Sequence, residues 1–492
     1  MRTYACREAV EFLTEALSLS ERLPTKPSAL QRGRWERRLG VAYMGLGQME
    51  KSKNYLESAA ATLGWPVPRG LGPQIVTILR ELLAQIGRRF QKHALVAGDA
   101  PLTEAAETTL EAARAYEPLL EIYFILNDQA LSLHTSLVTL NLSEAAGRLS
   151  PELAKAYAAL CVACSAIPAY PLSRMYRHHS LGVARQINDQ PALAYSLRNI
   201  GIFHSGAGDW PNAHAVIEEA VEIFRRLGDR HMYATCLSVL SRVFFFQSNF
   251  DQAARLFSEV YQLGVDHDDP QVQGWGLSGQ ADSILPLGQL AESSALAERA
   301  AQFASDRTVE TSVYGSLAIS RLRQYQWDAA RQAADRTAAL LAQSPPVLFI
   351  TLDAYAGVAE VYLTLWAQQR NQPEARVLQA RARAALGALG SYARVFPIGR
   401  PRIALFRGRY AWQTGNTHAA THEWQRSLAA ASRLQMDYDQ ALAHVELALH
   451  GVAVDHSYHE QRGRAILERL GASYDLARIQ TDTLADKGVF VQ

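Results

Sequence analysis

The chain has 492 residues, of which 48% are hydrophobic and 20% charged, so a large core is expected and wholesale disorder is excluded. A formal net charge of +1 provides no global field that would attract nucleic acid, and we expect no specific nucleic-acid partner. Four cysteines are too few to stabilise a chain of this length by disulfide bonds, which favours a reducing, cytoplasmic location. No window approaches ~18 uninterrupted apolar residues, so we expect no membrane insertion.

The first part of the chain predicts helices that are divided by one long break. Residues 5–22 repeat apolar side chains at intervals of three and four, which indicates an amphipathic helix rather than a signal peptide. The longest helix-poor stretch covers residues 64–74. If the array is divided, we expect the division there, between an N-terminal helix group (1–63) and a main array (75–492). The same periodicity predicts further helices at 75–92, 103–116, 118–146, 151–166 and 171–186.

The middle of the chain repeats one pattern at an offset of 40 residues. Each copy has a small residue, a larger one, a turn residue, and then small, large and small positions. The aligned positions are Gly201, His204, Gly208, Ala213, Ile217 and Ala220 in the first copy, Ser241, Phe244, Ser248, Ala253, Phe257 and Val260 in the second, and Ala281, Ile284, Gly288, Ser293, Ala297 and Ala300 in the third.

The same spacing recurs before and after these copies. Helices are also predicted at 346–368, 373–394, 437–450 and 457–470. The matching positions are Leu39, Gly40, Tyr43, Gly47, Ser52, Leu56 and Ala59 near the start, then Ala318, Tyr325, Ala330 and Ala334, and finally Gly408, Gly415, Ala420 and Trp424.

Such spacing has a physical cause. Small residues let two antiparallel helices approach closely, and a large residue one turn away fills the neighbouring hole. The pattern resembles the tetratricopeptide repeat, whose period is ~34, so the period of about 40 found in this sequence indicates longer helices or linkers. We therefore predict an all-α, right-handed α-solenoid of antiparallel helix pairs that extends over residues 1–492.

Signatures of catalysis and of cofactor binding are missing from the sequence. It contains no GxxxxGK[ST] phosphate loop, no GxGxxG after a strand, no GxSxG elbow and no HExxH. We expect no catalytic, cofactor-binding or metal-binding residues, and the sequence does not identify the residues that bind a partner.

Several short motifs were weighed against simpler interpretations. Cys161 and Cys164 form a CxxC that could be redox-active or half a zinc site, but without a second pair we interpret them as buried core thiols. His418 and His422 could face one metal, and we interpret them as surface histidines, like the pairs at 178–179 and 456/459. DHDD (266–269) lacks the spacing of an EF-hand, so we interpret it as an acidic loop and a helix cap.

Two basic clusters contain aromatic residues, a combination that can bind single-stranded nucleic acid. They are RGRWERR (32–38) and RMYRHH (174–179). Each spans only about two turns, so we interpret both as solvated helix faces. Tyr43, Phe244, Phe257 and Trp424 lie at core spacings, and Trp210 and Trp327 are placed to close turns.

Longer strings resemble the helical tail of bacterial multidomain AAA-type ATPases, in which the tail follows a class III adenylate/guanylate cyclase or protein-kinase domain. The likeness covers nearly the whole chain, and the family's catalytic domains are absent from it. It implies a non-catalytic regulatory or partner-binding module, either free-standing or part of a larger protein. The strings are LGVAYMGLGQMEKSKNYLESAAATLGWPVPRG (39–70), PELAKAYAALCVA (151–163), GDWPNAHAVIEEAVEIFRRLGDR (208–230), YAGVAEVYLTLW (355–366), VFPIGRPRIALFRGRY (395–410) and LERLGASYDLAR (467–478).

Three functions remain open at this point. The first is a scaffold that binds a protein or peptide in a concave groove and serves as a sensor module of a signalling ATPase or cyclase, in cis or in trans. The alternative is a small-molecule-sensing repeat domain of a transcription-regulator-type ATPase. The third is an enzyme with an unrecognised site, which a closed pocket with converging titratable groups would support.

Overall fold

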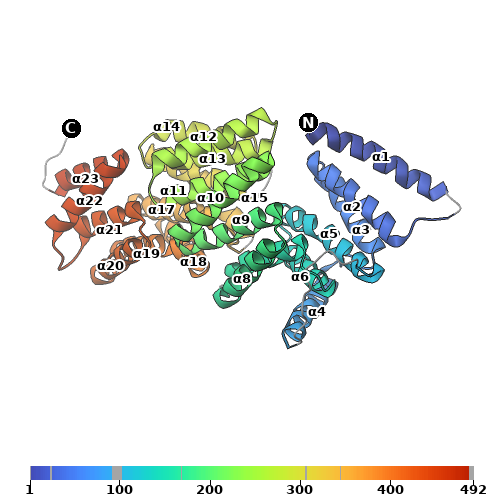
Figure 1. Ribbon diagram of the computed structural model, residues 1–492. Helices are drawn as coiled ribbons and strands as arrows, with labels where there is room; N and C mark the ends of the chain where they lie inside the picture. Colours follow the sequence, from blue (N-terminus) through green and yellow to red (C-terminus); the bar gives the residue numbers. More distant parts are fainter. Residues whose placement is uncertain are drawn as a thin grey trace. The chain divides into compact units, whose positions relative to one another are not determined.

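The computed structural model describes residues 2–22, 25–90, 102–167, 169–304, 307–343 and 345–486. Within these residues the protein is all-α, and successive helices pack in antiparallel pairs (Figure 1), except that α4 (Leu71–Phe90) packs against α6 (Gln129–Ala145). The predicted fold class is confirmed. None of the described helices combines the length and the apolar character that crossing a membrane requires.

The chain divides into two compact units. Unit 1 comprises Met1–Cys164 and Ala169–Asn199, and unit 2 comprises Ser165–Pro168 and Ile200–Gln492. The predicted break at 64–74 falls within unit 1, where residues 63–70 join two helices, and the division there stays a prediction.

Unit 1 packs its helices around an apolar core centred on Leu56, Tyr116, Leu119 and Ile122. Its helices are α1 (Arg2–Arg22), α2 (Ala29–Gly45), α3 (Met49–Thr62), α4 (Leu71–Phe90), α5 (Glu104–Ile125), α6 (Gln129–Ala145), α7 (Pro151–Ala166) and α8 (Tyr170–Gln186), followed by the first half of α9 (Gln190–Ala207).

The predicted boundary between the helices at 103–116 and 118–146 was wrong. Helix α5 continues through Pro118 to Ile125, and the chain reverses at Asn127, which has a φ of 57°. A proline inside a helix removes one backbone hydrogen bond. Here the burial of Leu119 and Ile122 outweighs that loss, and the side chain of Asp128 caps α6 by accepting a hydrogen bond from Leu131 N.

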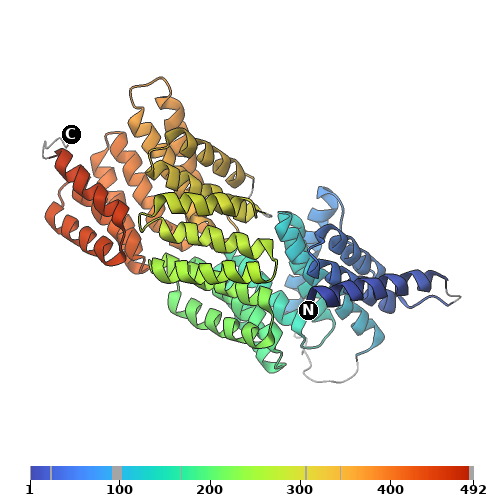
Figure 2. The same ribbon diagram turned by 90° about the horizontal axis from the view of Figure 1, so that it is seen from above.

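Unit 2 continues the array from α9 to the C-terminal helices. In Figure 2 its yellow-green helices lie side by side in successive rows. They are α10 (Trp210–Leu227), α11 (Arg230–Phe246), α12 (Phe250–Asp266), α13 (Pro270–Ile284), α14 (Leu290–Ala301), α15 (Arg307–Arg323), α16 (Trp327–Leu341), α17 (Leu352–Gln368), α18 (Ala375–Val395), α19 (Arg400–Gln413), α20 (Thr417–Arg433), α21 (Asp437–His450), α22 (His456–Leu470) and α23 (Ser473–Asp486), with 3-10 turns at Phe349–Thr351 and Pro397–Gly399.

Long helices account for the long repeat period. Helices α10, α11 and α12 have 18, 17 and 17 residues, and they are joined by short turns. The turn residues Gly208, Ser248 and Gly288 all have positive φ, as the alignment predicts. The aligned positions Ala213, Ile217, Ala253 and Phe257 are fully buried, whereas Phe244 is half-buried.

Unit 2 also winds back on itself. Trp210 Nε1 donates to Leu434 O over 2.6 Å, and Tyr438 N donates to Ser248 Oγ over 2.9 Å. Ser473 Oγ donates to Leu287 O over 2.7 Å. In each case a turn within one helix pair meets a segment 186 to 224 residues away, so repeats contact more than their nearest neighbours.

Candidate functional site

The short motifs singled out in the sequence do not assemble into a reactive site. Cys161 and Cys164 are both buried, and burial raises the pKa of Cys161 to about 12. His418 and His422 are exposed, as predicted. The side chain of Asp269 caps α13 by accepting from Val272 N, which confirms the cap in the acidic loop. Within the described residues, no three His, Cys, Asp or Glu side chains are grouped to hold a metal ion.

Two of these interpretations need correction. The cluster at 32–38 is not simply solvated, because Arg34 and Arg37 reach the buried carboxylate of Glu111 on α5. His459 is half-buried, and its Nδ1 lies 2.8 Å from Nδ1 of the buried His444. In both cases tertiary packing brings a charged or polar partner from a neighbouring helix.

In unit 2, charged side chains are buried between the first helices of successive helix pairs, such as α11, α13, α17, α19 and α21. Arg242 Nη1 on α11 donates to Asp282 Oδ2 on α13 over 2.6 Å, and both side chains are buried. Arg402 on α19 pairs in the same way with Asp439 on α21. Burial raises the pKa of Asp353 on α17 to about 6, although Arg402 and Arg242 oppose the shift. These groups therefore come from five helices and share one buried network.

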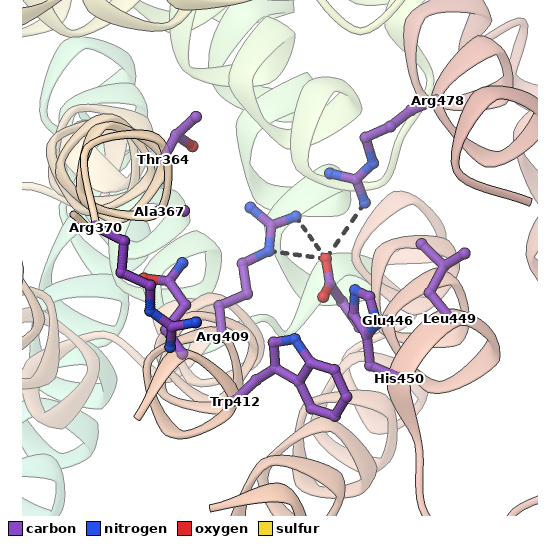
Figure 3. Close-up of a pocket in the computed structure, with 10 residues that line it drawn as sticks. Thr364, Ala367, Arg370, Arg409, Trp412, Glu446, Leu449, His450 and Arg478 are labelled. Atoms are coloured by element: carbon purple, nitrogen blue, oxygen red, sulfur yellow. Dashed lines mark hydrogen bonds and ion pairs between the residues drawn. The ribbon is translucent and has the colours of Figure 1, made fainter. Parts of the chain in front are cut away.

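Closer to the C-terminus, unit 2 has a cavity of about 360 Å³. Four first helices contribute to its wall, and Figure 3 shows the side chains that surround it. We call it the arginine pocket. Its lining comprises Thr364 and Ala367 on α17, Arg370 in the turn after α17, Arg409, Trp412 and Gln413 on α19, Glu446, Leu449 and His450 on α21, and Arg478 on α23.

Glu446 is the centre of this arrangement. It is 5% exposed, and its Oε1 accepts from Nε of Arg409 over 2.8 Å. The same oxygen lies 2.8 Å from Arg409 Nη2 and accepts from Arg478 Nη2 over 3.3 Å (Figure 3). Burial would raise the pKa of Glu446, but the two guanidinium groups outweigh it and lower the pKa. Glu446 is therefore a carboxylate at neutral pH.

The remaining wall combines an aromatic ring and an amide. The Trp412 indole stacks on His450 with ring centroids 4.6 Å apart and an interplanar angle of 21°. Gln413 Nε2 donates to Leu363 O, whereas its Oε1 is buried and has no hydrogen-bond partner among the described residues. The pocket thus offers cationic donors, one aromatic surface and one unsatisfied acceptor. This combination suits binding of a polar ligand with negative charge.

The sequence did not identify these residues, yet it contains a signal that could have found them. Arg402 and Arg409 lie seven positions apart on α19, and Asp439 and Glu446 lie seven apart on α21. Residues seven apart share one helix face. The arginines on α19 and the acidic residues on α21 have the same spacing, which predicts two ion pairs between these neighbouring helices. The spacing does not predict a cavity.

Comparison with known proteins supports the repeat assignment. The family model for the tetratricopeptide repeat matches residues 192–263. Among curated proteins, none matches this chain.

Several solved structures resemble the chain at low sequence identity. A Rap protein complexed with competence and sporulation factor is 10% identical, with a TM-score of 0.47 over 79% of this chain and 98% of that one. Yeast Tom70 is 14% identical, with a TM-score of 0.33 over 96% and 88%. The APC/C hetero-tetramer Cut9–Hcn1 is 14% identical, with a TM-score of 0.39 over 91% and 90%.

Proposed function

Because the chain is an all-α solenoid with a tetratricopeptide-type repeat region, we propose that it is a non-catalytic scaffold that binds a protein partner. The observation that carries the proposal is the outward apolar face of α4 in unit 1. We call this surface the α4 face. It consists of Leu71, Ile75, Val76, Leu79, Leu82, Leu83 and Ile86, whose exposed fractions range from 39% to 76%.

Helix α4 is attached to unit 1 by its polar side. Gln85 Nε2 donates to Asn141 Oδ1 over 2.6 Å and to Glu144 Oε2 over 2.8 Å. Asn141 Nδ2 in turn donates to Glu81 Oε2 over 2.7 Å. Amphipathic helices normally bury the apolar side and expose the polar one. Here the arrangement is reversed, which leaves a contiguous apolar stripe in solvent.

A stripe of this kind marks an interaction site, because single exposed apolar residues are common but contiguous ones are rare. Ile75, Leu79, Leu82 and Ile86 follow each other at intervals of four, three and four. That is the spacing by which two helices interdigitate along a seam. The partner element that fits best is therefore an amphipathic helix with an apolar stripe of its own.

We place the partner on the α4 face rather than in the concave groove suggested by the sequence. In unit 2, Arg242, Asp282, Arg402 and Asp439 on the first helices are already buried against one another. The wider context we propose is regulation of a bacterial signalling ATPase or nucleotide cyclase. Its support is the resemblance of strings such as 39–70 and 208–230 to the helical tail of those enzymes.

The test uses Leu79→Glu combined with Leu83→Glu. Two carboxylates in the middle of a helix–helix seam are expected to weaken partner binding at least about 100-fold. Binding is measured by biolayer interferometry against purified signalling ATPase and cyclase modules from the organism that encodes this chain. Leu227→Glu is the matched control, because Leu227 is a single exposed leucine in unit 2. Equal binding by all three proteins, or no binding by the wild-type chain, would count against the proposal.

A further inference from the structure

We propose that the arginine pocket binds the phosphomonoester group of a small organic molecule. The pocket lies entirely within unit 2. The inference is therefore independent of the α4 face, and either can fail without the other.

The charges in the wall do not balance. Arg370, Arg409 and Arg478 face one carboxylate, Glu446. Guanidinium groups stay protonated at any physiological pH. Behind the wall, Arg323 has two acidic neighbours, Asp475 and Glu360, and the buried Asp475 is also stabilised by Arg478 and Arg409. Four guanidinium groups therefore face three carboxylates in and behind the wall, which leaves an excess of one positive charge when His450 is neutral.

Some of the donors are also unused. Arg370 has no ion-pair or hydrogen-bond partner among the described residues, and Figure 3 shows it at one side of the cavity opposite Glu446. Arg409 directs Nε and Nη2 at Glu446, which leaves its Nη1 without an acceptor in the described structure. A guanidinium that keeps free N–H groups beside a cavity can bind the oxygens of a tetrahedral anion.

The unused donors favour a phosphomonoester over a carboxylate. A phosphomonoester carries about −1.5 to −2 charges near pH 7 and three acceptor oxygens, whereas a single carboxylate carries −1 and two oxygens. The phosphomonoester oxygens can accept from Arg370 and from Arg409 Nη1 at the same time. An acceptor matters at Arg409 because its side chain is only 14% exposed, and a buried N–H group without an acceptor is costly.

The size of the cavity indicates that the phosphate has an organic substituent. A volume of 360 Å³ equals about twelve water molecules at their share of liquid volume. Inorganic phosphate would leave most of it filled with solvent. The Trp412 indole and the free Oε1 of Gln413 offer apolar and hydrogen-bonding contacts to the remainder of the ligand.

The experiment is calorimetric titration of the full chain with defined probes. They are adenosine monophosphate, ribose 5-phosphate, their unphosphorylated forms adenosine and ribose, inorganic phosphate, citrate, and a phosphoserine peptide. We expect at least one organic phosphate to bind at least about tenfold more tightly than its unphosphorylated form and than inorganic phosphate. Citrate is expected to bind more weakly than that phosphate.

Two substitutions link binding to the pocket. Arg370→Gln is expected to weaken phosphate binding about tenfold, because one charge-assisted contact is lost from an exposed, unpaired side chain. Arg376→Gln is the control, since Arg376 is an exposed arginine on α18 that does not line the cavity. Glu446→Gln removes the competing carboxylate and is expected to tighten phosphate binding.

The outcomes that overturn the inference are specific. One is that no organic phosphate binds, or that Arg370→Gln behaves like Arg376→Gln. Another is that citrate or inorganic phosphate binds as tightly as the best organic phosphate. A phosphoserine peptide that binds more tightly than every small phosphate would assign the pocket to a protein ligand and would also overturn it.

Discussion

Pairs of one glycine and one large residue set the distance between helices of a pair. In Gly40–Leu56, Gly201–Ile217 and Gly408–Trp424 the two residues are 16 positions apart. A Cβ atom on Gly40 would lie 2.7 Å from Leu56 Cγ, and Cβ atoms on Gly201 and Gly408 would overlap Ile217 and Trp424. The small and large positions of the repeat are therefore in direct contact, as the spacing predicts.

Substitution of one such glycine tests this contact. Gly201→Ala is expected to destabilise unit 2 by about 1–3 kcal/mol, because the added methyl group overlaps Ile217 in a packed core. Gly387→Ala is the control, since Gly387 is also helical but has no atom near the added Cβ. That change should stabilise by about 0.5–1 kcal/mol through helix propensity. Urea unfolding measures both, and a gain in stability for Gly201→Ala would contradict the contact.

At the scale of elements, the pattern of apolar residues located the helices, whereas tertiary contacts decided where some of them end. The α5 boundary shows this, because Pro118 suggested a break but Leu119 and Ile122 are buried in the core of unit 1. The contact between α21 and α22 is another example. It joins His444 and His459 through their Nδ1 atoms, whereas the sequence paired His459 with His456.

This histidine pair predicts a pH dependence of stability. Burial, together with His459 and Arg462, lowers the pKa of His444 to about 4. The folded state therefore binds a proton less readily than the unfolded state, whose histidines titrate near ~6.5. Stability is complete above that pH and is lost as the pH falls towards about 4.

The variant His444→Gln removes this titration. We expect the loss of unfolding free energy between pH 7.5 and pH 5 to shrink by about 2 kcal/mol relative to the wild type. Urea denaturation at the two pH values measures it. His418→Gln, at an exposed position on α20, should leave the loss unchanged. An unchanged pH dependence in His444→Gln would exclude this pair as its source.

At the scale of the whole molecule, unit 2 is more than a row of neighbouring repeats. In an open solenoid, each repeat is stabilised only by the repeats beside it. Here Trp210 at the start of α10 is 1% exposed and donates to the C-terminal carbonyl of α20 at Leu434. Distant repeats should therefore unfold together.

Trp210→Phe tests that coupling. Loss of the indole N–H leaves the Leu434 carbonyl without this donor, which is expected to cost about 1–3 kcal/mol. We expect faster amide hydrogen exchange around Leu434 and in the first turn of α21, more than 200 residues from the substitution. Trp327→Phe, at a half-buried position on α16, is the control. Exchange changes confined to α9–α11 would show that the repeats are stabilised only locally.

The sequence by itself determined the helix pairs, their period and the positions of their turns. These features depend on residues that are close in sequence, such as Gly201, Gly208 and Ile217, whose spacing states how two consecutive helices pack. The tertiary structure alone decided the arginine pocket, the reversed orientation of α4 and the return of unit 2 onto itself. The pocket depends on how neighbouring helices are aligned, because Arg409, Glu446 and Arg478 lie on α19, α21 and α23. The return of unit 2 depends on the small rotation between successive repeats, which accumulates over many repeats and brings Trp210 to Leu434. The spacing within a single repeat does not contain that rotation.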